Sequence, residues 1–266
     1  MKITFIGGGN MGEAMLAAVL EKKLATTADV SVSDISEERR DYLKERYDVT
    51  VTGDNKAAAS GRDIVVLAVK PQNLAEVAEG LKGCLKATQL VVSIVAGVTI
   101  DTLSKGLGHN RIVRVMPNTP AQIGYGISVW TATAGVTDEQ KGWTQSILTA
   151  MGKEIYFRNE EYLDMVTAVS ASGPAYFFLF AEALIEAAVN IGLPRQDAEA
   201  LVAQTMLGSA HLMQQSDRPP AELRRNVTSR GGTTERALQV FEEGGLAKIV
   251  AEAVEAAYKR AKELGS

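Results

Sequence analysis

The segment NVTSRGGTTERAL, residues 226–238, places two adjacent glycines and two adjacent threonines between stretches whose patterns predict helices. Adjacent glycines leave backbone N–H groups uncovered, and threonines at a helix N-terminus add hydroxyl groups, so the loop could bind the carboxylate of a small molecule. The alternative is a threonine N-cap with Glu235 in the first helical turn. That alternative accounts for one threonine, but not for both threonines and the paired glycines.

A second candidate site lies near the start, in FIGGGNMGEAM, where Gly7, Gly9 and Gly12 have the G-x-G-x-x-G spacing. An apolar strand precedes them and a helix of small residues follows. The three glycines would permit a tight turn, close approach of a pyrophosphate and close packing of helix on strand. The phosphates would meet free N–H groups at the helix N-terminus. An incidental strand–helix turn is the alternative, but the agreement of strand, turn and helix favours a dinucleotide site.

The residues after the second predicted strand bear on which dinucleotide would bind. Asp34 ends that strand, where an acid can bind both ribose hydroxyls of NAD and repel a 2′-phosphate. Ser33, Ser36, Arg39 and Arg40 lie close by, and hydroxyls and arginines suit a phosphate. A solvated helix start with Ser36 as the N-cap is the alternative. The sequence therefore leaves both NADH and NADPH open.

Three further strand ends carry rigid, small or polar turns, in LAVKPQ, SIVAGV and VMPNTPA. Lys70 and Pro71 follow the first of these strands, Ala96 and Gly97 the second, and Asn118 the third. Open α/β sheets bind ligands at the carboxyl ends of their strands. Together these turns predict the floor of a nicotinamide pocket.

The elements that must position these residues begin with alternating strands and helices. Near-continuous apolar runs suit strands covered on both faces, and the strand–helix–strand repetition predicts right-handed crossovers. We therefore expect a Rossmann-like, doubly wound α/β domain with a mainly parallel sheet over residues 1–159, and two added edge strands at Gly126–Thr131 and Glu154–Phe157. The other expected elements are strands at Lys2–Ile6, Val30–Asp34, Ile64–Ala68, Leu90–Ile94 and Ile112–Met116, and helices at Gly12–Leu24 and Glu37–Tyr47.

Residues 160–266 have helical patterns only, which predicts an all-α domain for dimerisation and substrate binding. Pro174 should kink its first helix. The run AYFFLFAEALIEAAV is apolar on several faces and should be buried, either in a helical core or against a partner in an intimate homodimer. Glu182 and Glu186 within it argue against a membrane span. The expected helices are Tyr162–Ile191, Arg195–Gln215, Pro220–Val227, Thr234–Glu243 and Leu246–Glu263.

The composition is that of an ordinary soluble protein, with 46 % apolar and 23 % charged residues. A net charge of −4 argues against a general binder of nucleic acid or anionic membranes. The single cysteine, Cys84, excludes an internal disulfide framework, and no signal-peptide pattern precedes the first strand, so we expect a cytoplasmic protein.

His109 and His211 stand in polar surroundings and are expected at the surface. No motif for a metal site or an acyl-enzyme is found.

The segments FIGGGNMGEAM, LAVKPQ, VSIVAGVTI, VMPNTPA, SASGPAY and NVTSRGGTTERAL resemble, in order and spacing, those of pyrroline-5-carboxylate reductase, the last enzyme of proline synthesis. The resemblance covers essentially the whole chain, and the closing motif is its most specific part. The chain departs from the family at Ala171, where many members have glycine, and at Asp34, where serine, asparagine or arginine is common. The second departure leaves the cofactor preference open.

The resemblance implies that NADPH or NADH reduces L-1-pyrroline-5-carboxylate to L-proline by hydride transfer to the C=N carbon. It implies that Thr234 is catalytic, as a hydrogen-bond partner of the ring nitrogen, and that Glu160 lies near the substrate; a surface junction is the alternative for Glu160. The implied substrate-binding loop contains Ser229, Gly231, Gly232 and Thr233. The expected cofactor-binding residues are Ile6, Gly7, Gly8, Gly9, Asn10, Met11, Gly12, Ser33, Asp34, Asn55, Ala68, Val69, Lys70, Pro71, Ala96, Gly97, Asn118 and Asn226, the last with a helix C-cap as its alternative.

The resemblance also implies an interlocked homodimer, which in some family members assembles into a pentamer of dimers. One rival is a β-hydroxyacid dehydrogenase, which needs a lysine on the long interdomain helix; Tyr162–Ile191 contains none. The other rival is a catalytically silent dinucleotide-binding module that senses redox state. A sensor has no need of an imine pocket, so the SRGGTTERAL loop argues against it.

Overall fold

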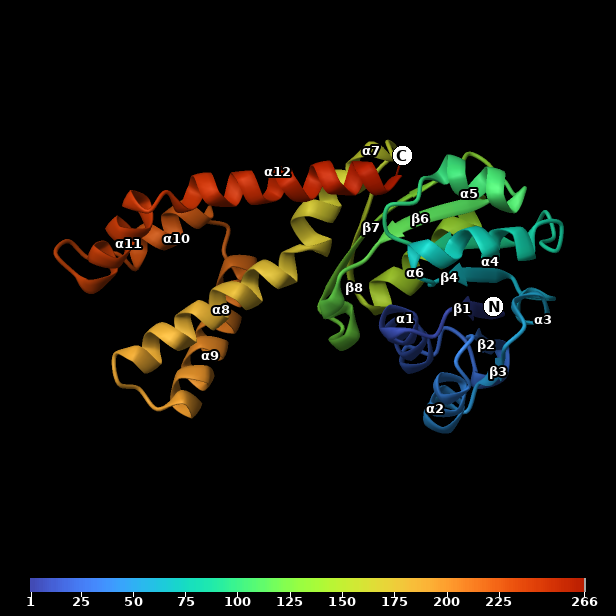
Figure 1. Ribbon diagram of the computed structural model, residues 1–266, viewed down its shortest axis with the longest axis horizontal. Helices are drawn as coiled ribbons and strands as arrows, with labels where there is room; N and C mark the ends of the chain where they lie inside the picture. Colours follow the sequence, from blue (N-terminus) through green and yellow to red (C-terminus); the bar gives the residue numbers. More distant parts are fainter. Residues whose placement is uncertain (266) are drawn as a thin grey trace. The chain divides into compact units, whose positions relative to one another are not determined.

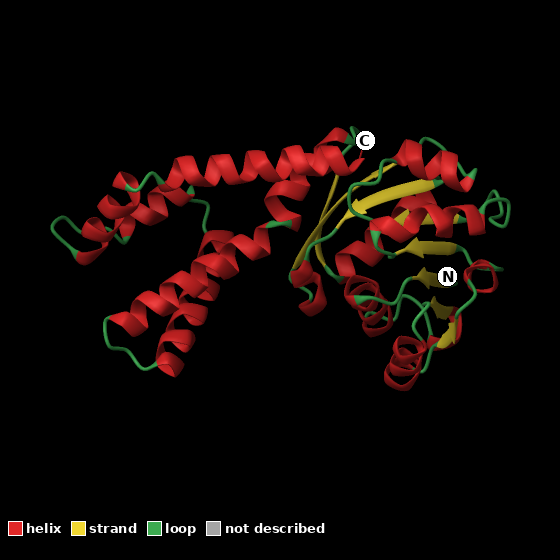
Figure 2. Cartoon of the chain, in the orientation of Figure 1, coloured by secondary structure: helices red, strands yellow, loops and turns green. Residues whose placement is uncertain are grey.

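The computed structural model describes residues 1–265, which form two compact units (Figure 1). The first unit contains Met1–Pro174 and the end of the chain from Ala257, and the second contains Ala175–Ala256. All strands belong to the first unit, and the second is built of helices and loops (Figure 2). The expected division into a sheet-containing and a helical part is therefore present.

The sheet has eight strands in the order β3-β2-β1-β4-β5-β6-β7-β8. Every neighbouring pair is parallel except β6 and β7, which are antiparallel. The strands are β1 Ile3–Ile6, β2 Val30–Ser33, β3 Thr50–Thr52, β4 Ile64–Leu67, β5 Leu90–Ser93, β6 Ile112–Met116, β7 Gly126–Ala132 and β8 Gly152–Tyr156. This confirms the doubly wound, mainly parallel sheet and the two added edge strands. Only β3 was not expected, because it is three residues long and partly exposed.

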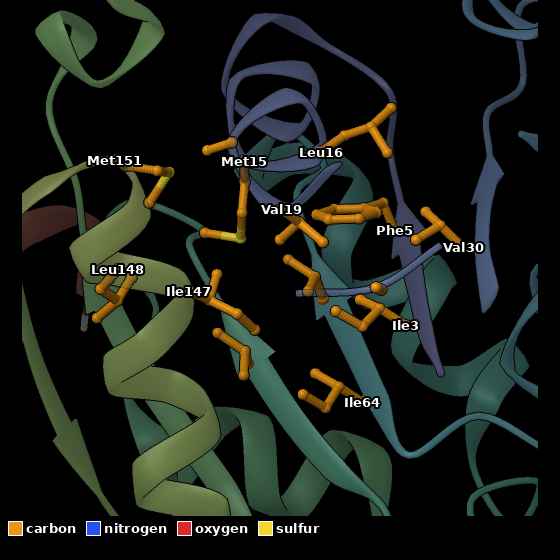
Figure 3. Close-up of a cluster of buried hydrophobic side chains, with 14 of the residues drawn as sticks. Ile3, Phe5, Met15, Leu16, Val19, Val30, Ile64, Ile147, Leu148 and Met151 are labelled. Atoms are coloured by element: carbon orange, nitrogen blue, oxygen red, sulfur yellow. The ribbon is translucent and has the colours of Figure 1, made fainter. Parts of the chain in front are cut away.

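Helices cover both faces of the sheet because alternate side chains of each strand point to opposite faces. Ile3 and Phe5 of β1 belong to the core under α1 and α6, whereas Ile6 belongs to the core under α3, α4 and α5. Figure 3 shows Met15 of α1 and Ile147 of α6 meeting the first of these faces. The helices of this unit are α1 Asn10–Glu21, α2 Glu37–Tyr47, α3 Asn55–Ala59, α4 Leu74–Leu81, α5 Ile100–Leu107, α6 Asp138–Ala150 and α7 Glu161–Val166.

The long helix expected over residues 162–191 is interrupted next to Pro174. It consists of α7, a π-helical turn at Thr167–Ala171 and α8 Gly173–Asn190. Proline has no N–H to donate to the carbonyl of Ser170, four residues earlier. That carbonyl instead accepts a hydrogen bond from Asn118 Nδ2 at 3.2 Å. The kink expected at Pro174 is seen as an interruption of the helix just before it, and an asparagine from another loop satisfies the backbone group that the proline leaves free.

A buried ion-pair network attaches α7 to the sheet. Arg114 of β6 is 1 % exposed, and its Nη1 and Nη2 donate to Glu160 Oε1 and Asp164 Oδ1, both at 2.8 Å. Glu160 Oε1 also accepts from the N–H of Ile100, the first residue of α5, at 2.8 Å. The first compact unit extends to Pro174, because this network holds α7 on the sheet, and the expected domain boundary between residues 159 and 160 stays a prediction.

The second unit contains most of α8, together with α9 Arg195–Gln215, α10 Pro220–Asn226, α11 Thr233–Glu243 and the larger part of α12 Leu246–Gly265. The expectation that α8 is buried in a helical core is wrong for the single chain. Phe177, Phe178 and Leu179 are 64 %, 63 % and 66 % exposed. Residues 1–265 of one chain do not cover this part of the helix. Of the two interpretations from the sequence, burial against a partner subunit therefore remains. Among residues 1–265, Glu161–Asn190 is the one helical run with the length and apolarity of a membrane span.

Close packing of α1 can be tested with two glycine substitutions. A Cβ at Gly12 would lie 2.5 Å from the carbonyl oxygen of Gly7, whereas a Cβ at Gly142 of α6 would have no neighbouring atom within 4 Å. We expect Gly12→Ala to lower the free energy of unfolding by about 1–3 kcal/mol through overpacking. Gly142→Ala should raise it by roughly 0.5–1 kcal/mol, because alanine favours helix. Urea unfolding measures both changes, and an equal change at the two positions would contradict the packing described here.

Candidate active site

A cleft of about 790 Å³ lies at the carboxyl ends of β1, β2 and β4. The strand order reverses between β1 and β4, the point at which open α/β sheets bind ligands. The structure brings many of the expected cofactor-binding residues together here. Those that line the cleft are Ile6, Gly7, Gly9, Ser33, Asp34, Asn55, Ala68, Val69 and Lys70.

The glycine turn shapes one wall of this cleft. Gly7 has φ +99°, and a Cβ there would lie 2.6 Å from the carbonyl oxygen of Ala68, so only glycine fits. A Cβ at Gly9 would meet no protein atom within 4 Å, so the backbone at this residue faces open space. Gly9 is also the N-cap of α1, and no side chain caps that helix. The helix N-terminus is thus open to an anion, which fits the pyrophosphate of a dinucleotide.

Gly8 has a different surrounding from its neighbours in the turn. Its N–H donates to Asp34 Oδ2 at 2.8 Å, and its carbonyl oxygen accepts from Arg39 Nε at 2.5 Å. Both backbone polar groups of Gly8 therefore have partners within the protein. Asn10, Met11 and Gly12 form the first turn of α1 and do not line the cleft. Pro71, which follows Lys70, does not line the cleft either.

The carboxylate of Asp34, which follows β2, accepts two backbone hydrogen bonds at its end of the cleft. Its Oδ2 accepts from Gly8 and its Oδ1 from the N–H of Ser36 at 2.9 Å. Ser36 also caps α2, since its Oγ accepts from the N–H of Arg39 at 3.2 Å. The capping role considered as an alternative is thus present, and Ser36 lines the cleft as well.

Sequence reasoning missed several residues of this cleft, chiefly those that come from β3, α3 and α4. The signal for α3 was present, because Asp54 precedes a helix-forming run and its Oδ1 accepts from the N–H of Lys56 at 2.8 Å. Ile35 extends a predicted strand end and is 87 % exposed. The missed lining residues are Ile35, Gly53, Asp54, Lys56, Asn73, Glu76, Val77 and Gly80.

Three other expected cofactor residues lie outside this cleft and have structural neighbours of their own. Gly97 has φ +72°, and a Cβ there would lie 2.7 Å from the Cβ of Leu264, near the end of α12. Ala96 precedes it in the same turn. Asn118 Oδ1 accepts from the N–H of Ile127 at 2.9 Å while its Nδ2 binds Ser170. Close packing and hydrogen bonding thus account for these residues, and their contact with a nicotinamide stays a prediction.

The loop before α11 differs in detail from the expectation. The helix begins at Thr233, one residue earlier than expected, and Gly232 is its N-cap. The N–H of Gly231 donates to Glu235 Oε2 at 2.7 Å, and the N–H of Gly232 donates to Ser229 O at 3.0 Å. The expectation that both glycine N–H groups are uncovered is therefore wrong, because the loop satisfies them internally.

The feature of this loop that could still serve the expected anion site is the N-terminus of α11. No side chain caps α11, so a threonine N-cap is excluded as the reason for the two threonines. Within residues 1–265, the N–H groups of Thr233 and Thr234 donate to no protein acceptor. Asn226 is the last residue of α10, and Val227 rather than Asn226 is the C-cap. These residues belong to the second unit, and binding of substrate or cofactor by them stays a prediction.

Glu160 and His109 have clear structural partners. Glu160 binds Arg114 and Ile100, so its carboxylate holds elements together, and its place beside a substrate stays a prediction. His109 is buried rather than at the surface, with 7 % exposed, and its Nε2 lies 2.8 Å from Gln89 O. No group of three or more His, Cys, Asp or Glu side chains within residues 1–265 is arranged to hold a metal ion.

Two family models match this chain. Residues 160–264 match the pyrroline-5-carboxylate reductase dimerisation model, and residues 2–97 match the model described as NADP oxidoreductase, coenzyme F420-dependent. The first covers the helical part with α7, and the second covers the strands and turns that form the cleft. The presence of a dimerisation domain establishes that this family forms homo-oligomers.

Relatives of known name are similar along their whole length. A pyrroline-5-carboxylate reductase from Synechocystis sp. is 41 % identical over 100 % of this chain and 98 % of its own. A solved reductase from Coxiella burnetii is 41 % identical, with a TM-score of 0.92 and coverage of 100 % and 98 %. A Plasmodium falciparum pyrroline carboxylate reductase, solved with NADP bound, is 32 % identical, with a TM-score of 0.91 and the same coverage. The chain therefore belongs to the pyrroline-5-carboxylate reductase family of NAD(P)H-dependent oxidoreductases.

Proposed function

We propose that this chain reduces L-1-pyrroline-5-carboxylate to L-proline with NADPH or NADH, as the final step of proline synthesis in the cytoplasm. The observation that carries the proposal is the occurrence, in one chain, of the cleft at Gly9 and the uncapped helix N-terminus at Thr233. Full-length similarity to named reductases supports the same assignment.

The reaction places few demands on the protein. A protonated cyclic imine accepts hydride at its C=N carbon without a nucleophile or a metal ion, and bound NAD(P)H supplies that hydride. The protein has to hold the two reactants in alignment, bind the carboxylate and provide one proton. The open N-terminus of α1 would bind the pyrophosphate, and Asp34 lies where it would meet a ribose.

The loop before α11 would bind the imine. The N–H groups of Thr233 and Thr234 point along the N-terminus of α11 and would bind the carboxylate, with Ser229 beside them. The Thr234 hydroxyl would donate to the ring nitrogen and relay a proton from water, since a neutral threonine is itself a poor acid. Gly231 and Gly232 contribute by shaping the turn, and Asn226 would reach the cofactor.

The apolar surface of α8 supports assembly of two chains through residues 160–266. Phe177, Phe178 and Leu179 form a surface that a soluble monomer would leave in contact with water. Glu182 and Glu186 lie farther along the same helix, and Glu186 pairs with Arg195, so a second copy of the chain suits this surface better than lipid. A pentamer of such dimers is the larger assembly implied by the resemblance to the family.

The proposed reaction can be separated from its rivals in one assay. Adding pyrroline-5-carboxylate to the protein with NADH or NADPH should oxidise the nucleotide and form proline. No reduction of NAD⁺ or NADP⁺ should follow from adding β-hydroxyacids. Nucleotide binding without turnover of the imine would indicate a sensor instead, and turnover of hydroxyacids would indicate a dehydrogenase.

Removal of the Thr234 hydroxyl tests the proposed proton relay. We expect Thr234→Ala to lower kcat/KM for the imine at least tenfold, which corresponds to about 1.4 kcal/mol of transition-state stabilisation. Thr234→Ser keeps the hydroxyl and should restore most of the activity. Circular dichroism checks that both variants are folded. A Thr234→Ala variant with wild-type kinetics across the pH range would remove the proposed role.

Replacement of Asp34 tests whether its carboxylate selects between NADH and NADPH at the ribose. Asp34→Ser removes the charge that repels a 2′-phosphate, so the ratio of kcat/KM for NADPH to that for NADH should rise at least fivefold. Asp41→Ser, an exposed position on α2, is the matched control and should leave the ratio unchanged. An unaltered ratio in Asp34→Ser would show that this carboxylate does not face the ribose.

Interface formation can be tested on α8. Phe178→Glu places a charge on the proposed interface, where it would have to be desolvated, so the assembly should dissociate at concentrations that leave the wild type intact. Sedimentation velocity measures the change. Lys153→Glu, at an exposed position on β8, serves as the control charge change. Dissociation of neither protein would contradict the proposed interface.

A further inference from the structure

Arg39 of α2 lies close to the ribose end of the cleft, but its guanidinium is held elsewhere. Its backbone N–H binds Ser36, which lines the cleft three residues earlier on α2. Its side chain instead contacts the glycine turn and α1: Nε donates to Gly8 O at 2.5 Å and Nη2 pairs with Glu13 Oε2. The guanidinium also lies over the ring of Tyr42, with 4.8 Å between Cζ and the ring centroid. Arg39 is accordingly absent from the cleft lining.

Glu13, in the first turn of α1, is the centre of the contacts that hold this arginine. Its Oε1 accepts from the hydroxyl of Tyr47 at 2.8 Å and from that of Tyr42 at 3.1 Å, and its side chain is only 16 % exposed. Burial by itself would raise the pKa of Glu13, but the hydrogen bonds from Tyr47 and Arg39 outweigh it and hold the pKa below the usual value. Burial and the neighbouring carboxylate raise the pKa of Tyr47 to about 12, so Tyr47 stays a donor. Arg46 Nε lies 3.8 Å from the same Oε1, so Glu13 is ionised at neutral pH and engaged with four side chains of α2.

The remaining charges at the ribose end are unfavourable for a 2′-phosphate. Asp34 lines the cleft with a negative charge. Arg40 is not part of the cleft lining, and its Nη1 is engaged by the carbonyl oxygens of Asp34 and Ile35 at 2.8 and 3.1 Å. Besides Asp34, the lining contains two cations and two further acids, which are Lys56, Lys70, Asp54 and Glu76. A phosphate there would meet carboxylates as well as lysines, with both arginines bonded to protein groups.

We infer that Glu13 is a specificity-determining residue that favours NADH over NADPH by retaining the Arg39 guanidinium at α1. The inference rests on the proposed use of NAD(P)H. Glu13 itself does not reach the cleft lining, so it acts through Arg39 and is a positioning residue. A released Arg39 would extend beside Ser36, where its planar fork could bind a phosphate in bidentate fashion.

The decisive measurement is the affinity for NADP⁺ and NAD⁺ by isothermal titration calorimetry on the full chain, which does not depend on turnover. Glu13→Gln keeps the size of the side chain and its capacity to accept from the tyrosines, but removes the charge that holds Arg39. The ratio of NADP⁺ to NAD⁺ affinity should rise at least fivefold. Glu21→Gln, an exposed acid at the other end of α1, is the matched control and should change the ratio less than twofold.

A second pair of variants tests whether Arg39 causes the rise in the ratio of NADP⁺ to NAD⁺ affinity. Arg39→Gln combined with Glu13→Gln should return the ratio to within twofold of the wild type. Arg39→Gln alone should leave NADP⁺ affinity within twofold, since Arg39 is already withdrawn, and this arm decides the question if Glu13→Gln does not fold. A smaller than fivefold rise in Glu13→Gln, or a larger than twofold loss of NADP⁺ affinity in Arg39→Gln alone, overturns the inference. Failure of the wild type to bind either nucleotide would instead refute the proposed function.

Discussion

The close approach of α1 to the adjacent strands β1 and β4 is the constraint on which the nucleotide-binding half depends. Gly7 turns with a positive φ against the carbonyl of Ala68, and Gly12 lies against the carbonyl of Gly7. Any side chain at these two positions would push the helix away from the sheet. The same approach leaves the first turn of α1 uncapped at Gly9, so the requirement for tight packing and the requirement for an anion site are met by one short segment.

Features that depend on local sequence could be predicted, because the physical cause lies within a few residues. The apolar runs predicted the central strands, the glycine spacing predicted the turn after β1, and Pro174 predicted a kink where the helix is interrupted before α8. The strand β3 and the helix α3 were missed because each is too short to show a period. Because these two elements were missed, Lys56 and its neighbours on one side of the cleft were not predicted either.

Features that depend on distant partners could not be predicted from a single sequence. Glu160 was expected near the substrate or at a surface junction, and its bond to Arg114, 46 residues away in the chain, was not foreseen. His109 stood among polar residues, yet it is buried against Gln89 O. The aromatic run of α8 predicted burial, yet Phe177, Phe178 and Leu179 are exposed within the single chain. In each case the missing information is the identity of the neighbour in space.

The charged trio Arg114, Glu160 and Asp164 constrains how chimeras of this family can be designed. The start of the dimerisation model at residue 160 suggests a natural splice point, but a splice there would take both carboxylates from one parent and the arginine from the other. A parent with a different residue opposite Arg114 would leave a guanidinium sealed in the protein without a counter-ion, which is far more harmful than losing the whole trio. Exchange of helical halves is therefore better made after Pro174, where the helix has already left the sheet and the trio travels intact.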